Sequence, residues 1–123
     1  RAKKLKELLK ESEKQKTEEI ITLTSASFDK FLEKTNLPVL VDFWAEWCMP
    51  CRIMEPVIEE LARDYMGKVM FAKVNVDENP EVASRYNIMS IPHFIIFRNG
   101  RPTERIVGAV GRGPLEDALK KYI

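Results

Sequence analysis

The sequence feature that most constrains the fold is an almost uninterrupted apolar run over residues 39–45, which directly precedes a long helical pattern. Apolar residues occupy consecutive positions in this run, and that pattern is typical of a strand buried on both faces. Such strands occur in sheets that helices cover on both sides. The one polar residue in the run is Asp42, and an ionised carboxylate at a buried position is costly unless it is paired or solvated.

Other apolar periodicities place further strands and helices around this run. Patterns typical of strands occupy residues 20–23, 39–45, 69–76, 94–97 and 104–107. Patterns with helical spacing occupy residues 24–34, 48–65, 80–86 and 115–122. Asn99-Gly100, between the last two strands, predicts a hairpin turn. We therefore predict an α/β fold in which four helices flank a central mixed five-stranded sheet, because helical crossovers join parallel strands and the hairpin adds antiparallel ones.

The helical patterns also predict their own starts and buried faces. Thr24 or Ser25 is expected to cap the first helix, because a hydroxyl group can accept a hydrogen bond from a free N–H of the first turn. In the long helix, the residues expected to face the core are Ile53, Met54, Val57, Ile58, Leu61 and Ala62.

The composition changes near residue 20 and divides the chain in two. Residues 1–19 carry seven basic and five acidic side chains, with Leu5, Leu8 and Leu9 at helical spacing. We interpret them as a charged N-terminal extension, which is either solvated or docked as a short helix through its leucines. It lacks the hydrophobic segment and cleavage site of a secretory signal. Residues 20–123 have the size and composition of one globular domain.

Charge and cysteine content exclude several classes of function. The 20 basic and 19 acidic residues give a net charge of +1, whereas a nucleic-acid-binding protein needs a concentrated basic face. No apolar run approaches the roughly 18 residues that cross a membrane. We therefore expect neither nucleic acid nor a membrane as a partner. Two cysteines and one histidine are too few for a disulfide-rich scaffold or for a complete four-ligand zinc site.

The two cysteines form a Cys48-Met49-Pro50-Cys51 motif where the buried strand gives way to the long helix. The N–H groups and dipole of a helix start stabilise a thiolate, and residues three apart on a helix are close enough to form a disulfide. Pro50 is tolerated because the first helical turn loses no hydrogen bond. The alternatives are half of an intermolecular zinc site and a structural disulfide, although so short a loop gains little stability from closure. The context favours a redox pair.

Residues 41–51 closely resemble the active-site segment of the thioredoxin family, including its small bacterial and archaeal members. Further matching segments follow in the same order: residues 73–77, Ser90-Ile91-Pro92, Asn99-Gly100 and residues 107–109. The resemblance covers about residues 20–123 and implies a thioredoxin fold. It also implies a cytoplasmic monomer that reduces disulfide-containing target proteins and is itself reduced by a thioredoxin reductase. No cofactor or metal is expected beyond the redox-active disulfide between Cys48 and Cys51.

The resemblance assigns roles to the cysteines and to Asp42. Cys48, the more exposed sulfur, attacks a target disulfide, and Cys51 then attacks Cys48 to release the reduced target. Asp42, with a raised pKa, accepts the proton of Cys51 through a water, and Lys73 on the adjacent strand is its charge partner. From the residues alone, Asp42 could equally be a satisfied core group or a strand-edge residue that faces solvent.

The resemblance also implies a substrate-binding rim around Cys48. The Ile91–Pro92 bond matches the family's cis peptide, and the backbone of Ile91 would pair with an extended target segment. Trp47, Ile91 and Gly108 would form the flat apolar part of the rim. The sequence alone favours a different interpretation, an ordinary trans proline at the start of a strand.

Two positions depart from the family pattern. Met49 stands where glycine is usual between the cysteines, and His93 stands where threonine is usual after the proline. The residues expected to tune the redox potential are Met49, Pro50, Lys73 and His93. His93 could add a titration near neutral pH or point away from the cysteines. An oxidase or isomerase of the same fold is one alternative function, and a binding module that uses the extension and the rim, with incidental redox chemistry, is another.

Overall fold

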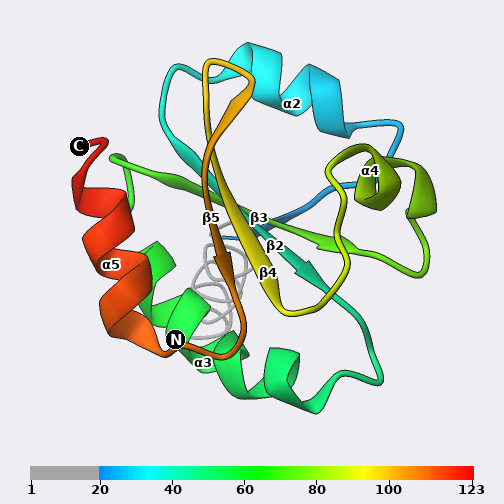
Figure 1. Cartoon of the computed structure of the whole chain (residues 1–123). Coiled ribbons are helices and arrows are strands. Elements are labelled where there is room, and N and C mark those ends of the chain that lie inside the picture. The colour runs from blue at the N-terminus through cyan, green and yellow to red at the C-terminus, as the bar shows by residue number, and fades with distance from the viewer. Residues whose placement is uncertain (1–19) are drawn as a thin grey trace, which may run out of the picture.

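The computed structural model describes residues 20–123, so the predicted extension over residues 1–19 lies outside the described range. Five strands and four helices make up this range (Figure 1). The strands are β1 (Ile20–Thr22), β2 (Val39–Trp44), β3 (Met70–Asn75), β4 (His93–Arg98) and β5 (Arg101–Val107). The helices are α2 (Phe28–Lys34), α3 (Met49–Asp64), α4 (Pro80–Arg85) and α5 (Arg112–Lys120). None of these four helices has the length and apolar character needed to cross a membrane.

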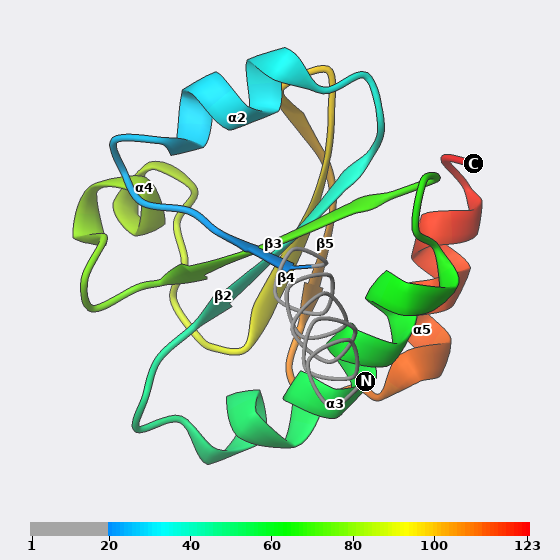
Figure 2. The ribbon, with the colours of Figure 1, turned by 180° about the vertical axis from the view of Figure 1, so that it is seen from behind.

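The strands form one mixed sheet with β2 at its centre. The strand order is β1-β3-β2-β4-β5, and the view from behind shows β1 beside β3 (Figure 2). β1 and β2 both run parallel to β3, whereas β4 is antiparallel to β2 and to β5. In this register Asp42 lies between Lys73 on β3 and Phe94 on β4. The predicted mixed sheet is thus confirmed, and Asp42 lies on its central strand.

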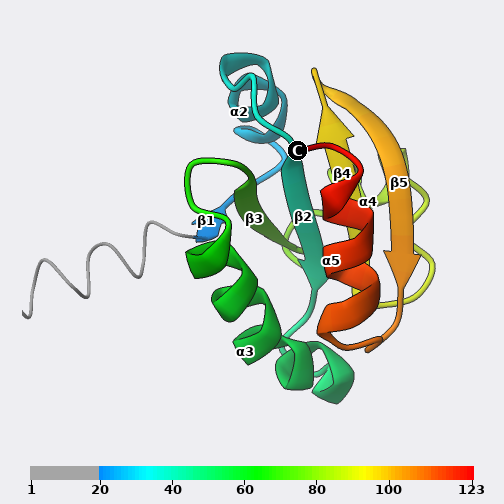
Figure 3. The same ribbon diagram turned by 90° about the vertical axis from the view of Figure 1, so that its left-hand side faces the viewer.

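Helices cover both faces of the sheet, as the continuous apolar pattern of β2 predicted. Leu40 faces the layer of α3 and α5, where it belongs to one cluster with Met54 and Leu115. Figure 3 shows these two helices together on the near side of the sheet. Phe43 faces the other side and packs in the cluster that α2 and α4 complete. β2 is therefore held from both sides, and the loop that follows it starts from a rigid base.

Three details of the helices differ from the prediction, and one is that α5 begins at Arg112, three residues before the predicted start. α2 begins at Phe28 because Thr24 caps a separate preceding turn, in which its N–H donates to Ser27 Oγ at 2.9 Å and the Ser27 N–H donates to Thr24 Oγ1 at 3.2 Å. The prediction that Ile53 faces the core is wrong, since 61% of this residue is exposed. The buried residues of α3 are Cys51, Met54, Ile58, Leu61 and Ala62. Ile53 projects about 100° around the helix from Met54, which turns it toward solvent.

A tight turn joins β4 to β5. Asn99 and Gly100 have positive φ angles of 53° and 78°, as both central residues of a type I′ hairpin turn require. Asparagine and glycine adopt this left-handed backbone at lower cost than other residues. The hairpin predicted from these two residues is confirmed.

Candidate active site

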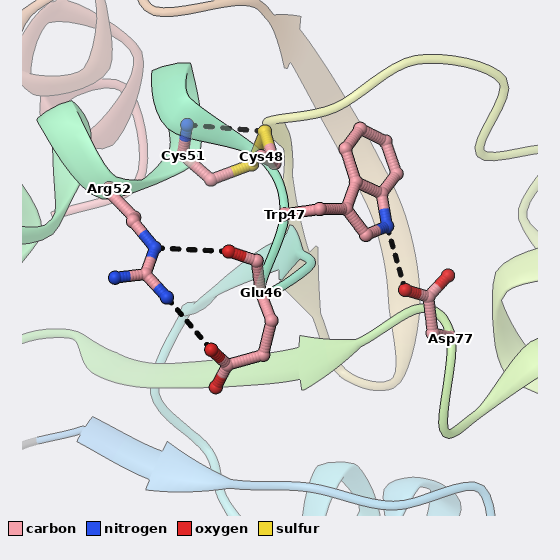
Figure 4. Close-up of a disulfide and its surroundings, with 6 residues drawn as sticks. All are labelled: Glu46, Trp47, Cys48, Cys51, Arg52 and Asp77. Carbon is pink, nitrogen blue, oxygen red and sulfur yellow. Dashed lines mark hydrogen bonds and ion pairs between the residues drawn. A yellow bond between two sulfur atoms is a disulfide. The ribbon is translucent and has the colours of Figure 1, made fainter.

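The two cysteines lie at the N-terminal end of α3. Cys48 is the N-cap residue, its Cα lies 5.3 Å from that of Cys51, and the two sulfurs form a disulfide. The N–H of Cys51 donates a hydrogen bond to Cys48 Sγ at 3.3 Å (Figure 4). After reduction, this N–H and the helix dipole would stabilise a thiolate at Cys48. Pro50 occupies the first turn of the helix, as predicted.

Both cysteines are buried in the disulfide form, with 3% of Cys48 and 2% of Cys51 exposed. The expected difference in exposure between them is therefore almost absent in this state. Ala45 is part of the same cluster, and Trp44 and Ile91 pack against it. Cys48 is therefore buried although it lies at the start of a helix, because these residues pack closely around the disulfide.

Two side-chain contacts hold the loop between β2 and α3 on either side of Cys48 (Figure 4). Arg52 donates from Nε to the backbone oxygen of Glu46 at 3.0 Å and from Nη2 to its carboxylate at 2.8 Å. The indole Nε1–H of Trp47 donates to Asp77 Oδ2 at 2.8 Å. Sequence reasoning missed these partners of the loop. Asp77 could have been found, because it follows β3, whose carboxyl end lies at the same sheet edge as that of β2.

Asp42 is a buried carboxyl group whose Oδ1 has no hydrogen-bond partner among the described residues. Burial raises its pKa from 3.8 to about 7, while the charge of Lys73 lowers the pKa and that of Glu55 raises it. Asp42 is therefore neither a satisfied core aspartate nor a strand-edge residue that faces solvent. Its pKa lets it exchange a proton near neutral pH.

A cavity of about 150 Å³ is shared by Asp42 and Cys51. Its lining residues are Ile20, Asp42, Trp44, Cys51, Glu55, Ile58, Glu59 and Lys73. A polar cavity of this size can admit water, which gives a proton a path between the thiol and the carboxylate. Sequence reasoning missed Glu55 and Glu59, although their helical spacing from Cys51 could have revealed them. Within residues 20–123, no cluster of three or more His, Cys, Asp or Glu side chains is suited to a metal ion.

Lys73 lies on β3 directly beside Asp42 in the sheet. Its ammonium group is 5.4 Å from the centre of the Trp44 ring, which is a cation–π distance. The positive charge lowers the pKa of Asp42 through space. The role of Lys73 as a charge partner and redox-tuning residue stays a prediction.

The loop before β4 and the end of β5 meet beside the cysteines. The Ile91–Pro92 peptide bond is cis, as the resemblance implied, and Ile91 packs against the cysteine cluster. The Gly108 N–H donates to the backbone oxygen of Pro92 at 2.8 Å, and its φ of +100° is one that side chains rarely permit. Trp47, 71% exposed, and the exposed Met49 add apolar surface. The roles of these residues in substrate binding and redox tuning stay predictions.

His93 faces the opposite side of the sheet from Asp42. Its ring lies edge-on to that of Phe43, with 6.4 Å between the centroids, and its Nε2 lies 3.4 Å from a guanidinium nitrogen of Arg105. Burial and then the charge of Arg105 lower the pKa of His93. A titration of His93 that is coupled to the cysteines stays a prediction, and such coupling would have to act across the sheet.

Comparisons with known proteins agree with this geometry. The thioredoxin family model matches residues 19–121. The chain is 46% identical to Thioredoxin 1 of Nostoc sp. and 48% identical to thioredoxin of Synechocystis sp., over 101 residues that cover 82% of this chain and 94% of each relative. It is 45% identical over 105 residues to the chloroplastic M-type thioredoxin of Spinacia oleracea, a match that covers 85% of this chain and 58% of the spinach protein.

Proposed function

Because the chain belongs to the thioredoxin family and, with its Cys48–Cys51 pair, is a protein-disulfide reductase and electron carrier, we propose that Cys48 is the attacking sulfur and Cys51 the resolving sulfur. The observation that carries this assignment is the position of Cys48 Sγ, which accepts the N–H of Cys51 at the start of α3. Negative charge on Cys48 is favoured by this N–H and by the helix dipole, whereas Cys51 Sγ accepts no hydrogen bond within residues 20–123.

In the first step, the Cys48 thiolate attacks one sulfur of a target disulfide. A bond forms between Cys48 Sγ and that sulfur, the target's own disulfide breaks, and its other sulfur leaves as a thiolate that takes a proton from water. The product is a mixed disulfide between Cys48 and the target. The backbone of Ile91 pairs with an extended target segment during this step, and the exposed faces of Trp47 and Met49 contact its apolar side chains.

In the second step, Asp42 accepts the Sγ proton of Cys51 through water in their shared cavity. The Cys51 thiolate attacks Cys48 Sγ, the mixed disulfide breaks, and the remaining target sulfur leaves as a thiolate that takes a proton from water, while Asp42 returns the Cys51 proton to water. Two electrons and two protons have then passed to the target, and the protein holds the Cys48–Cys51 disulfide. A thioredoxin reductase returns the pair to the dithiol.

The proposed setting of this cycle is a monomer in the cytoplasm that needs neither a cofactor nor a metal, because the two sulfurs carry the electrons themselves. The relatives named above include chloroplastic and cyanobacterial proteins. Cell fractionation tests the compartment, and recovery of the protein from an organelle stroma would overturn the cytoplasmic assignment. Sedimentation of the full chain tests the monomer.

Reduction of an insulin-type substrate, with a chemical dithiol as electron donor, separates the reductase from a binding module with incidental redox chemistry. Cys48→Ser should abolish turnover. A chain in which Leu5, Leu8 and Leu9 are all replaced by serine should retain it. Target binding that survives in the first variant and disappears in the second would support the binding module. The equilibrium potential of the cysteine pair separates the reductase from an oxidase, which would have a far higher potential than the cytosolic pool.

A further inference from the structure

Glu55 is a charged residue of the active-site cavity that the two-step reaction does not use. It follows Cys51 by four residues on α3, so the two side chains project from the same face of the helix. Both line the cavity that also contains Asp42. Glu55 is itself exposed, which places it where the cavity meets solvent.

Three charged side chains line this cavity together with Asp42. Lys73 comes from β3, and Glu55 and Glu59 come from α3. The other lining residues besides Cys51 are apolar or aromatic, namely Ile20, Trp44 and Ile58. On the β4 side, the register neighbour of Asp42 is Phe94, which carries no charge. The cavity of Asp42 is therefore lined by one cation and two carboxylates, and of these Lys73 and Glu55 shift the pKa of Asp42.

We propose that Glu55 is a positioning residue for the resolving step, in which its carboxylate, at the mouth of the cavity, makes Asp42 a stronger base toward the Cys51 thiol. This inference rests on the proposed role of Asp42 as the proton acceptor. A neighbouring negative charge favours the protonated form of a carboxyl group, and low-dielectric walls increase that effect. The charge of Glu55 accordingly raises the pKa of Asp42, in opposition to Lys73.

The geometry also explains why this influence can reach the reacting sulfur. Asp42 Oδ1 has no hydrogen-bond partner among residues 20–123, so no donor there weakens it as a base. Asp42 and Cys51 share one cavity with Glu55, and a proton that leaves Cys51 arrives on the carboxylate whose proton affinity Glu55 increases.

α3 supplies a matched control one helical turn further on. Glu59 also lines the cavity, yet it is not among the groups that shift the pKa of Asp42. Glu55→Gln and Glu59→Gln therefore each remove one negative charge with the same small change of shape, at neighbouring places on one helix. The inference requires that they differ in effect.

The first experiment titrates the Asp42 carboxyl carbon by NMR in the full-length disulfide form, in which neither cysteine titrates. The Asp42 midpoint of the unsubstituted chain should lie near neutral pH. Glu55→Gln should move it to lower pH by several tenths of a unit, and Glu59→Gln should move it much less. An unchanged midpoint in Glu55→Gln would overturn the inference.

The second experiment measures single-turnover release of a target thiol by the reduced chain between about pH 5 and pH 9. Glu55→Gln should slow release about 2- to 5-fold above the midpoint and less below it, because a weaker base is also ionised at lower pH. A uniform slowing at all pH values would indicate a merely structural role and would overturn the inference. Melting of each variant confirms that the fold is intact.

Asp42→Asn distinguishes failure of this inference from failure of the proposed function. If Asp42→Asn releases the target at the unsubstituted rate and pH dependence, Asp42 is not the proton acceptor and both proposals fail. If Asp42→Asn is slow while Glu55→Gln behaves like the unsubstituted chain in both experiments, the acceptor role stands and only the role of Glu55 is lost.

Discussion

Around the N-terminal end of α3, some buried polar atoms have no hydrogen-bond partner and some large apolar side chains are exposed to solvent. Asp42 Oδ1 and Trp44 Nε1 are buried there and have no hydrogen-bond partner among residues 20–123. Trp47, Met49 and Ile53 present large apolar surfaces to solvent at the same end. Unpartnered buried polar atoms cost stability, and large exposed apolar side chains add little to it.

At the C-terminal end of the same helix, the polar and charged side chains are instead paired. Arg112 of α5 forms ion pairs with Glu60, Asp64 and Glu116, and the Tyr65 hydroxyl donates to Glu116. These contacts join α3 to α5 and satisfy the charged groups at their junction. One helix thus separates its stabilising contacts from its reactive groups, so that the cysteine end can carry unfavourable features.

The largest effect that tests this contrast is the loss of either cysteine. Cys48→Ser should reduce protein-disulfide reduction to the uncatalysed level, because no thiolate remains to form the mixed disulfide. Cys51→Ser should retain the first step and accumulate a covalent complex with the target, which mass spectrometry under non-reducing conditions detects. Neither change should disturb the ion pairs at the far end, and the folded circular-dichroism spectrum is the control. A Cys51→Ser chain that turns over normally would contradict the assigned roles.

The buried carboxyl group gives the next largest effect, on stability. Because the pKa of Asp42 rises from 3.8 to about 7 on folding, the folded chain holds a proton that the unfolded chain releases between these values. Stability therefore falls as pH rises through this window, by about 4 kcal/mol in total for about three pH units. Asp42→Asn should remove this slope and be more stable than the unsubstituted chain above neutral pH.

Urea unfolding of the disulfide form of both chains between about pH 4 and pH 9 measures this effect. The difference between the two chains isolates Asp42 from the other ionisable groups. Equal slopes in both chains would show that Asp42 titrates normally and would remove the contrast between the two ends of α3.

The ion-pair junction should give a smaller effect on stability and none on the chemistry. Arg112→Met keeps an apolar stem and removes the guanidinium, so it should lower the melting temperature by a few degrees at low salt and by less at high salt. Because Arg112 lowers the pKa of Glu116 to about 2, the contribution is present above the ordinary pKa of Glu116 and disappears as pH falls toward 2. Disulfide reduction should be unchanged.

Calorimetry of Arg112→Met and of Arg85→Met provides the comparison. Arg85 forms a single exposed ion pair with Asp29, so its loss should matter less than that of a residue bonded to three carboxylates. A larger effect at Arg85 than at Arg112 would show that the α3–α5 junction is not the stabilising end.

The fold was predictable from the sequence because each element carries a local signal. The continuous apolar run of β2 and the Asn99-Gly100 turn are determined by burial and backbone conformation, which act locally. The start of α2 was less predictable, because a capped turn at Thr24 and the helix at Phe28 satisfy the same pattern. Only the hydrogen bonds of Thr24 and Ser27 distinguish a separate turn from the first turn of the helix.

The site was predictable in its covalent centre and less so in its surroundings. Cys48 and Cys51 are three residues apart at the start of one helix, so their pairing follows from local spacing. The contact of Trp47 with Asp77 joins residues 30 apart, and only the sheet brings them together. The exposure of Ile53 depends on how α3 is rotated about its own axis against the sheet. Residue spacing alone does not determine this rotation to better than one residue.

Ile53 gives the smallest and most specific test, because Met66 just beyond α3 is a matched counterpart. Both residues are 61% exposed, but Ile53 lies at the cysteine end and Met66 at the other. Ile53→Gln and Met66→Gln should each change the free energy of unfolding by less than about 0.5 kcal/mol, since neither side chain is buried. Ile53→Gln should raise KM for a protein disulfide about 2- to 3-fold, through lost apolar contact with the target, and leave kcat unchanged.

Met66→Gln should change neither constant, and both variants should reduce a small-molecule disulfide at the unsubstituted rate, because such a substrate is too small to reach Ile53. Steady-state kinetics with the two substrates measures this difference. Equal KM values in the two variants would mean that apolar exposure at the cysteine end serves no docking role. The contrast between the two ends of α3 would then be confined to Asp42 and the cavity that it shares with Cys51.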